Sequence, residues 1–151
     1  MRLVSVAGGG NLHTEINLHT IYDDIKAEVK RYEPESYPAL YLRFREDGAT
    51  IMAFTSGKYN IAGADSLAEL ESTHEEFISS IEELKGVTLE DARDTLELRN
   101  MVYTGEFDKN IRLEVLAADL GYENVEYEPE QFPALDYRPP ERKGLFKIFR
   151  T

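Results

Sequence analysis

The sequence contains no cysteine and no tryptophan, and only 3 of its 151 residues are histidine. Without cysteine the chain cannot form a disulfide framework, an iron–sulfur cluster or a thiolate zinc site, and it has no thiol nucleophile. His13, His19 and His74 do not have the spacing of metal ligands, and no glycine-rich loop precedes a phosphate-binding lysine. We therefore expect a protein that is not an enzyme and that needs no cofactor and no metal.

Long hydrophobic runs are also missing. No apolar segment reaches the length of a membrane span, and the N-terminus lacks the basic and then apolar pattern of a signal peptide. With 42% hydrophobic and 30% charged residues, the composition is that of an ordinary globular chain of one domain or two small joined ones. The sequence therefore predicts an intracellular, cytoplasmic protein that does not bind a membrane.

Basic residues are few, since 17 lysines and arginines stand against 29 acidic residues and leave a net charge of −12. This balance taken alone argues against binding a polyanion such as DNA. The acidic excess, however, is concentrated in residues 66–98, which contain ten acidic residues and only two basic ones. A surface far from this segment need not be acidic, so the net charge does not exclude a nucleic-acid partner.

An internal repeat is the most informative feature of the sequence. The segment Tyr32–Leu40 (YEPESYPAL) recurs 95 residues later as Tyr127–Leu135 (YEPEQFPAL), with seven of nine positions identical. The same offset pairs Phe54 with Phe149 without any gap. One register that holds over about fifty residues is typical of a duplicated structural unit.

Hydrophobic patterning predicts that each unit has an α+β fold. Alternating and apolar runs predict strands at 2–8, 40–44, 50–54 and 59–62, the first of them ending in a flexible loop at Gly8–Gly10. Ile21, Ile25 and Val29 have the spacing of a short amphipathic helix. Ser66 and Glu69 form a capping box that predicts a long helix, whose apolar face runs from Leu67 to Leu84. We expect both helices to cover one face of an antiparallel sheet.

The repeat predicts a first unit over 1–86, a linker over 87–95 and a second unit over 96–151. A full second copy, ending 95 residues after the end of the long helix, would extend past the end of this sequence. We therefore expect the second unit to lack about thirty residues, which would form its C-terminal strands and helix. The strand beside them would keep a free edge. Formation of a homodimer through that edge is an alternative that the sequence leaves open.

These segments resemble the TATA-box binding protein family, especially its archaeal form. The resemblance is carried by Arg99–Gly105 (RNMVYTG), by the YEPE segments of both repeats and by Phe54–Lys58 (FTSGK), and it covers essentially the whole chain. It implies a saddle-like α+β fold of two pseudo-symmetric repeats, in which a curved antiparallel sheet faces DNA and helices lie on the convex side. It also implies a role as a general transcription factor in transcription initiation.

The family is itself a standard example of minor-groove binding, in which apolar wedges kink the duplex by about 80°. The resemblance places the wedges on Tyr37 and Phe54 in the first repeat and on Phe132 and Phe149 in the second. It assigns base contacts to Asn100, with Ser5 at the equivalent position of the first repeat. The other implied DNA-binding residues are Ala7, Met52, Asn60, Ala62 and Val102 on the groove-facing surface, and Arg43, Lys58 and Arg138 at phosphates.

The implied partners are A·T-rich promoter DNA, transcription factor B and, through it, an RNA polymerase complex. Glu128, Glu130 and Gln131 fall where the family binds transcription factor B. Several positions depart from the family. Asn60 and Lys147 are polar where its members are apolar, Tyr37 replaces a phenylalanine, Asp65 stands where a lysine is common, and Gly8–Gly10 replaces part of a regular strand. An alternative therefore stays open, in which a degenerate relative binds transcription factor B without productive DNA bending and acts as a regulator. For either function the resemblance implies a location with the DNA, at the nucleoid in an archaeon or in the nucleus of a eukaryote.

Overall fold

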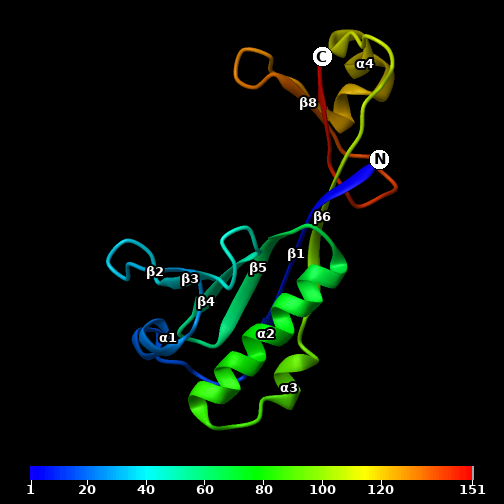
Figure 1. Ribbon diagram of the computed structural model, residues 1–151. Coiled ribbons are helices and arrows are strands. Elements are labelled where there is room, and N and C mark those ends of the chain that lie inside the picture. Colours follow the sequence, from blue (N-terminus) through cyan, green and yellow to red (C-terminus); the bar gives the residue numbers. More distant parts are fainter. Residues whose placement is uncertain (151) are drawn as a thin grey trace. The chain divides into compact units, whose positions relative to one another are not determined.

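The computed structural model describes residues 1–150 (Figure 1). The chain forms two compact units, Met1–Gly105 and a second that begins at Glu106. Each unit contains its own antiparallel sheet and its own hydrophobic core. The α+β class predicted from the sequence is therefore confirmed.

The first unit is built on a six-stranded antiparallel sheet with the strand order β2-β3-β4-β5-β1-β6. Its strands are β1 (Arg2–Asn11), β2 (Val29–Tyr32), β3 (Ala39–Arg43), β4 (Thr50–Phe54), β5 (Lys58–Ala64) and β6 (Glu97–Thr104). Its helices are α1 (Leu18–Asp24), α2 (Leu67–Lys85) and α3 (Glu90–Arg93). The helices α1 and α2 pack on one face of the sheet and leave the opposite face without a helix (Figure 1).

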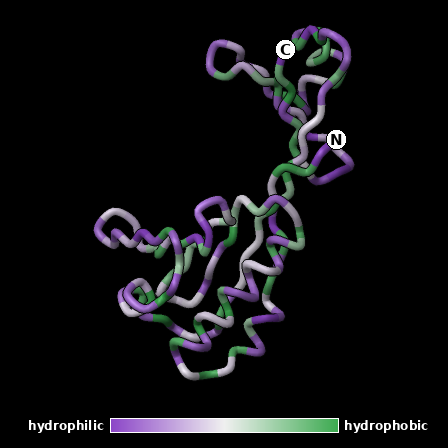
Figure 2. The backbone as a smooth tube through the Cα atoms, in the orientation of Figure 1, coloured by the Kyte–Doolittle hydropathy of each residue, from purple (hydrophilic) through white to green (hydrophobic). Residues whose placement is uncertain are grey.

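The long helix α2 begins at the capping serine that its sequence predicts. The Ser66 side chain accepts a hydrogen bond from the Glu69 backbone N–H, and Gly86 ends the helix in the left-handed conformation with φ 67°. Hydrophobic and hydrophilic stretches alternate along the helix (Figure 2), and Phe77, Ile78 and Ile81 on its inner side are completely buried. The acidic residues of α2 are thereby held on the outer side of the helix, away from the helix-free face of the sheet.

The predicted glycine loop is wrong, because Gly8, Gly9 and Gly10 are paired residues of β1. They pair with β5 on one side, and Gly8 and Gly9 also pair with β6 on the other. A Cβ atom on any of them would lie 2.4–2.8 Å from a neighbouring group, among them the hydroxyl of Tyr59 and the guanidinium of Arg99. The glycines are therefore required by close packing and not by flexibility.

The predicted helix over Ile21, Ile25 and Val29 is only partly present. The helix α1 ends at Asp24, Ile25 is extended, and Val29 begins the strand β2. The ammonium of Lys30 donates hydrogen bonds to the carbonyls of Tyr22 at 2.7 Å and Ile25 at 3.2 Å, so it satisfies the end of the helix as the chain reverses. The helical spacing of Val29 was therefore coincidental, since the residue belongs to a strand.

The predicted linker holds the short helix α3, which is tied to α2 by an arginine. The guanidinium of Arg93 forms ion pairs with Glu75 and Glu82 on α2. Hydrogen bonding to Arg93 lowers the pKa of both carboxyl groups. The chain thus enters β6 from a fixed point on the helical side of the first unit.

A buried polar cluster lies beneath the sheet of the first unit. The Tyr59 hydroxyl lies 2.6 Å from Nε2 of His74, and both residues are buried. Burial lowers the pKa of His74, an effect that Arg93 increases and Glu75 partly offsets. The neutral imidazole is therefore the form that the folded state favours.

This cluster predicts acid sensitivity of the fold. Because the folded pKa of His74 is lower than the unfolded value of about 6.5, the stabilisation is complete above that pH and is lost as pH falls towards the folded pKa. Thermal unfolding followed by circular dichroism between pH 8 and pH 5 should show the melting temperature falling over this range. In His74→Gln the fall should be smaller. An equal fall in both proteins would contradict the assignment to His74.

The second unit consists of one helix packed on a three-stranded sheet of order β7-β8-β9. Its elements are α4 (Leu113–Leu120), the 3₁₀ helix η1 (Tyr122–Asn124), β7 (Val125–Glu126), β8 (Ala134–Tyr137) and β9 (Phe146–Phe149). Leu113, Ala117 and Leu135 form its buried core. The opposite face of this sheet also carries no helix.

The two units pair their strands in the same register. In the first unit Ala39 pairs with Phe54, and in the second unit Ala134 pairs with Phe149, each 95 residues further along the chain. The three following pairs of each hairpin obey the same offset. The sequence repeat is therefore also a repeat of strand pairing.

No helix among residues 1–150 combines the length and the apolar character needed to cross a membrane.

Candidate nucleic-acid interface

The helix-free face of the first unit presents an aromatic pair. The backbone N–H groups of Ser36 and Tyr37 both donate to the Glu33 carbonyl, and this turn directs the chain into β3. Tyr37 and the last residue of β4, Phe54, then lie with ring centroids 6.4 Å apart, edge towards face. The Tyr37 ring is 44% exposed. The two wedge residues predicted for the first repeat are therefore neighbours on an accessible surface.

The second unit presents a matching pair by the same local geometry. The N–H groups of Gln131 and Phe132 donate to the Glu128 carbonyl, which repeats the turn of the first unit. The rings of Phe132 and Phe149 lie 6.0 Å apart, again edge towards face. They are 47% and 52% exposed. Each unit thus carries two neighbouring aromatic rings outside its buried core, of which Phe54 is half-buried and the other three are exposed.

The strands β1 and β6 bring the predicted base-contacting residues together. Ser5 pairs with Val102, and Ala7 pairs with Asn100. The 95-residue offset makes Ser5 equivalent to Asn100 and Ala7 equivalent to Val102, so replacing each residue of one pair by its equivalent gives the other pair. The equivalent residues are therefore related by a local two-fold axis at the Val6–Met101 pair. The side chains of Val6 and Met101 pack on the core side. Because side chains alternate along a strand, Ser5, Ala7, Asn100 and Val102 face the helix-free side.

The other predicted contact residues of the first unit occupy the same face. Met52 pairs with Asn60 and alternates with the core residues Ile51 and Ala53, and Ala62 pairs with Thr50. Asn60 is not free, because its side-chain oxygen accepts a hydrogen bond from the Arg99 guanidinium. We call the helix-free surface of this unit the first open face; its residues are Ser5, Ala7, Tyr37, Tyr41, Arg43, Thr50, Met52, Phe54, Lys58, Asn60, Ala62, Arg99, Asn100 and Val102. The helix-free surface of the second unit is the second open face; its residues are Phe132, Asp136, Arg138, Lys147 and Phe149.

The predicted phosphate-contacting residues are exposed at the margins of the sheets. Arg43 ends β3, and its guanidinium is held by Thr50 Oγ1 at 2.8 Å and the Glu46 carbonyl at 3.2 Å. Lys58 begins β5, and Arg138 directly follows β8 at the position equivalent to Arg43. All three side chains are accessible to a ligand.

The predicted partner-binding residues lie together in the loop between β7 and β8. Glu128, Glu130 and Gln131 are all exposed. The carbonyl of Glu128 is engaged in the turn that positions Phe132, but its carboxylate points to no hydrogen-bond partner among the described residues. The loop thus offers two acidic side chains and an amide to a partner without disturbing the sheet.

Three residues of the open faces were missed by sequence reasoning. The pairing of β1 with β6 shifts register between Ala7 and Gly8, which pair with Asn100 and Leu98. Arg99 is therefore an extra residue in β6, and this bulge places it over Gly9 on the first open face. A bulge has no signature in a single sequence, so Arg99 could not have been found. Tyr41 and Asp136, by contrast, follow from the alternation of β3 and from the offset of 95.

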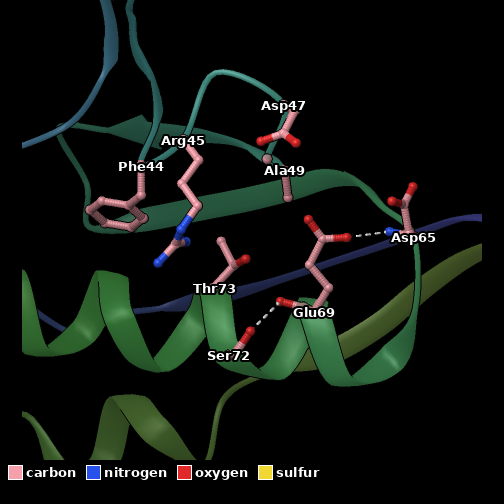
Figure 3. A pocket seen from close by; sticks show the side chains of 9 residues that line it. Phe44, Arg45, Asp47, Ala49, Asp65, Glu69, Ser72 and Thr73 are labelled. Carbon is pink, nitrogen blue, oxygen red and sulfur yellow. Dashed lines mark hydrogen bonds between the residues drawn. The ribbon is translucent and has the colours of Figure 1, made fainter.

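A separate cavity of about 300 Å³ lies on the helical side of the first unit, between the loop after β3 and the start of α2 (Figure 3). Its wall is polar, and its groups bond to one another: Glu69 accepts hydrogen bonds from the Asp65 N–H through its carboxylate and from the Ser72 hydroxyl through its carbonyl. Within residues 1–150 no cluster of three histidine or acidic residues has the arrangement of a metal site. This cavity shares no residue with the open faces.

The open faces are suited to a flat, apolar and deformable ligand. Small and apolar side chains such as Ala7, Met52 and Ala62 lie at the centre of the first open face. Each face carries an aromatic pair at one end, and arginine or lysine lies at its margin. The minor groove of A·T-rich DNA presents few hydrogen-bonding distinctions, and its recognition depends largely on shape and deformability. The chemistry of the faces therefore matches a minor groove better than a major groove.

Comparison with known proteins points to one family. Residues 1–84 and 95–151 match the family model described as Transcription factor TFIID (or TATA-binding protein, TBP). The chain is 38% identical over 149 residues to TATA-box-binding protein C of Halobacterium salinarum, which covers 99% of this chain and 82% of that protein. It is 32% identical over 149 residues to TATA-box-binding protein 1 of Haloferax volcanii, covering 99% of this chain and 77% of that protein.

A solved structure agrees with these sequence matches. The Methanococcus jannaschii TBP structure superposes with a TM-score of 0.77 at 31% sequence identity, covering 98% of this chain and 81% of that chain. The family resemblance read from the repeats is thus confirmed by sequence and by fold. The chain belongs to the TATA-binding protein family.

Proposed function

We propose that this protein is a general transcription factor that binds A·T-rich promoter DNA in the minor groove. The observation that carries the proposal is the repeated aromatic pair, Tyr37 with Phe54 and Phe132 with Phe149, at equivalent positions of the two helix-free faces, with Phe54 half-buried and the other three rings exposed. Exposed rings in register are costly to keep in water unless a ligand covers them. Family membership and the printed names of the relatives support the same reading.

In this mechanism the rings enter between base steps and unstack them, and the bent duplex then covers more of each face. Asn100 and Ser5 donate or accept hydrogen bonds at base edges near the β1–β6 pairing. Arg43, Lys58 and Arg138 bind phosphates, which positions the protein without reading sequence. The acidic outer side of α2 stays on the opposite side of its sheet, where it does not meet the phosphates.

The proposal is tested by a gel shift on an A·T-rich TATA duplex and a G·C-rich control across a salt series, since phosphate contacts weaken with salt. We expect a shift of the TATA duplex only. Absence of any shifted complex at every salt concentration would contradict DNA binding.

We also propose that transcription factor B binds the loop carrying Glu128, Glu130 and Gln131. The double variant Glu128→Arg, Glu130→Arg should lose the supershift produced by transcription factor B, because the charge of the loop is reversed, while the complex with DNA remains. The matched control is Glu33→Arg, Glu35→Arg in the equivalent loop of the first unit, which should keep the supershift. A supershift that survives in the loop variant would place the partner elsewhere.

Pull-down of transcription factor B by the protein in the absence of DNA separates the alternative function. Binding of transcription factor B in the pull-down, with no shift of any duplex in the gel, would identify a regulator that sequesters the factor.

A further inference from the structure

We propose that Asp136 and Lys147 form a specificity-determining pair that lets the second unit accept a G·C base pair where the first unit rejects one. The inference rests on the proposed function, because it requires the helix-free faces to contact the minor groove. It concerns one unit at a time and depends only on the contacts within each sheet.

The two side chains form an ion pair on the helix-free face of the second unit. Asp136 and Lys147 are direct partners across β8 and β9, and Nζ of Lys147 lies 2.9 Å from each carboxylate oxygen of Asp136. Their strand neighbours Leu135 and Ile148 pack on the core beneath α4. Since side chains alternate along a strand, the ion pair lies on the opposite surface.

The ion pair adjoins the proposed wedge of this unit. Nζ of Lys147 lies 5.0 Å from the centroid of the Phe132 ring, within the range of a cation–π contact. Phe149 is two residues from Lys147 on β9, so it shares the same face. The charged pair would therefore lie beside the base step that the rings open.

The equivalent position of the first unit has a different chemistry. There Tyr41 pairs with Met52 in the same register, 95 residues earlier than Asp136 and Lys147. The ring of Tyr41 packs 5.9 Å from that of Tyr37 and makes no ion pair. The two faces thus share their wedge geometry and differ in the pair behind the wedge, which is mainly apolar in one and ionic in the other.

The difference matches the one feature by which the minor groove distinguishes base pairs. An A·T pair presents only acceptors there, whereas a G·C pair adds the guanine N2 amino donor. An apolar surface leaves that donor without a partner when water is excluded. The Asp136 carboxylate can accept from it, and the Lys147 ammonium can donate to the neighbouring acceptor on the groove floor.

Mutual neutralisation makes an acidic group tolerable at this place. An isolated carboxylate facing DNA would be repelled by the phosphates, but Asp136 is bonded through both oxygens to a cation. Lys147 is 46% exposed and Asp136 18% exposed, so the ammonium can move towards the groove while the carboxylate stays at the surface of the sheet. A cross-strand ion pair that acts only in folding would have no effect on base preference.

The test is a position scan with the full chain and fluorescently labelled duplexes. An asymmetric A·T-rich site is prepared with a single G·C pair at each position in turn, and each affinity is divided by the affinity of the same protein for the unsubstituted site. Since a wrong base pair costs a typical site about 5- to 150-fold, we expect losses in that range at most positions and less than about threefold at one or two positions in one half of the site.

Two variants connect this tolerance to the pair. The variant Asp136→Tyr with Lys147→Met copies the residues of the first unit. In this variant a G·C pair at the tolerant positions should lower the affinity by as much as it does at the other positions. Tyr41→Asp with Met52→Lys is the reverse exchange and should create tolerant positions in the other half. The matched control is Glu114→Gln, a change on α4 that removes the ion pair between Glu114 and Arg150. This variant should show the same position-by-position loss of affinity as the wild type.

A uniform profile in the wild-type protein would overturn the inference even if the variants failed to fold. An unchanged tolerant position in the Asp136 and Lys147 variant would also overturn it. Either result, with normal binding of the unsubstituted site, leaves the proposed function intact. Failure to bind any duplex would overturn both.

Discussion

Replacing Phe132 by alanine is expected to lower the affinity for an A·T-rich duplex by about 5- to 150-fold, because stacking of a base on an aromatic ring contributes about 1–3 kcal/mol. The Phe132 ring is 47% exposed and packs mainly against Phe149. Its removal should therefore disturb DNA binding far more than folding. Fluorescence anisotropy with a labelled duplex measures the affinity, and circular dichroism reports the fold.

The matched control is Tyr122→Ala. Tyr122 is 73% exposed in the same unit, but it lies in η1 beside α4 and not on the helix-free face. Its removal should leave the affinity within about twofold, as is usual for a surface residue outside an interface. If both variants lost affinity equally, the aromatic pair would not be the contact surface.

The largest effect on stability is expected for Phe77→Ala, which should lower the free energy of unfolding of the first unit by about 3–5 kcal/mol. Phe77 is fully buried on α2, and its ring packs edge towards face against Tyr59 with centroids 5.0 Å apart. The loss is a large fraction of the 5–15 kcal/mol that is typical of a whole domain. Urea denaturation followed by circular dichroism measures it.

An exposed position on the same helix provides the comparison. Glu83→Ala changes the outer side of α2 and should shift the free energy of unfolding by no more than about 0.5 kcal/mol. A small loss in Phe77→Ala, similar to that of Glu83→Ala, would mean that α2 does not close the core of this unit.

The elements that sequence reasoning identified best are those with several agreeing signals. The helix α2 has a capping serine, a regular apolar face and a terminal glycine, and β4 agrees with its predicted bounds of 50–54. Even so, Leu67 and Leu84, at the two ends of the predicted apolar face, are 44% and 37% exposed. Helical periodicity identifies the inner face but not how far the sheet extends beneath it.

The errors arose where tertiary contacts override local preference. Three glycines in a row favour a loop by local preference, yet Gly8 and its neighbours pair with the adjacent strands of the sheet. Glycine is needed there because the adjacent strands and the Tyr59 hydroxyl approach too closely for a side chain. Val29 has helical spacing but pairs with Arg43 in the sheet. Neither contact is visible before the fold is known.

The candidate interface was predictable because the repeat constrains it twice. Tyr37 and Phe132 occupy equivalent turns, so the identification of one supports the other. The offset of 95 places Asp136 and Lys147 at the positions of Tyr41 and Met52, but that these residues are direct partners emerges only from the β3–β4 and β8–β9 registers. Arg99 required the bulge in β6, which the sequence does not encode in a recognisable form.

The central claim is that the helix-free faces bend DNA by inserting aromatic rings. The most direct measurement is the end-to-end distance of a doubly labelled A·T-rich duplex, determined by fluorescence energy transfer with and without the protein. The account predicts a bend approaching the 80° typical of this family, present with the wild type and lost in a variant lacking all four rings at Tyr37, Phe54, Phe132 and Phe149. A duplex that stays straight in a saturated complex with the wild-type protein would contradict it.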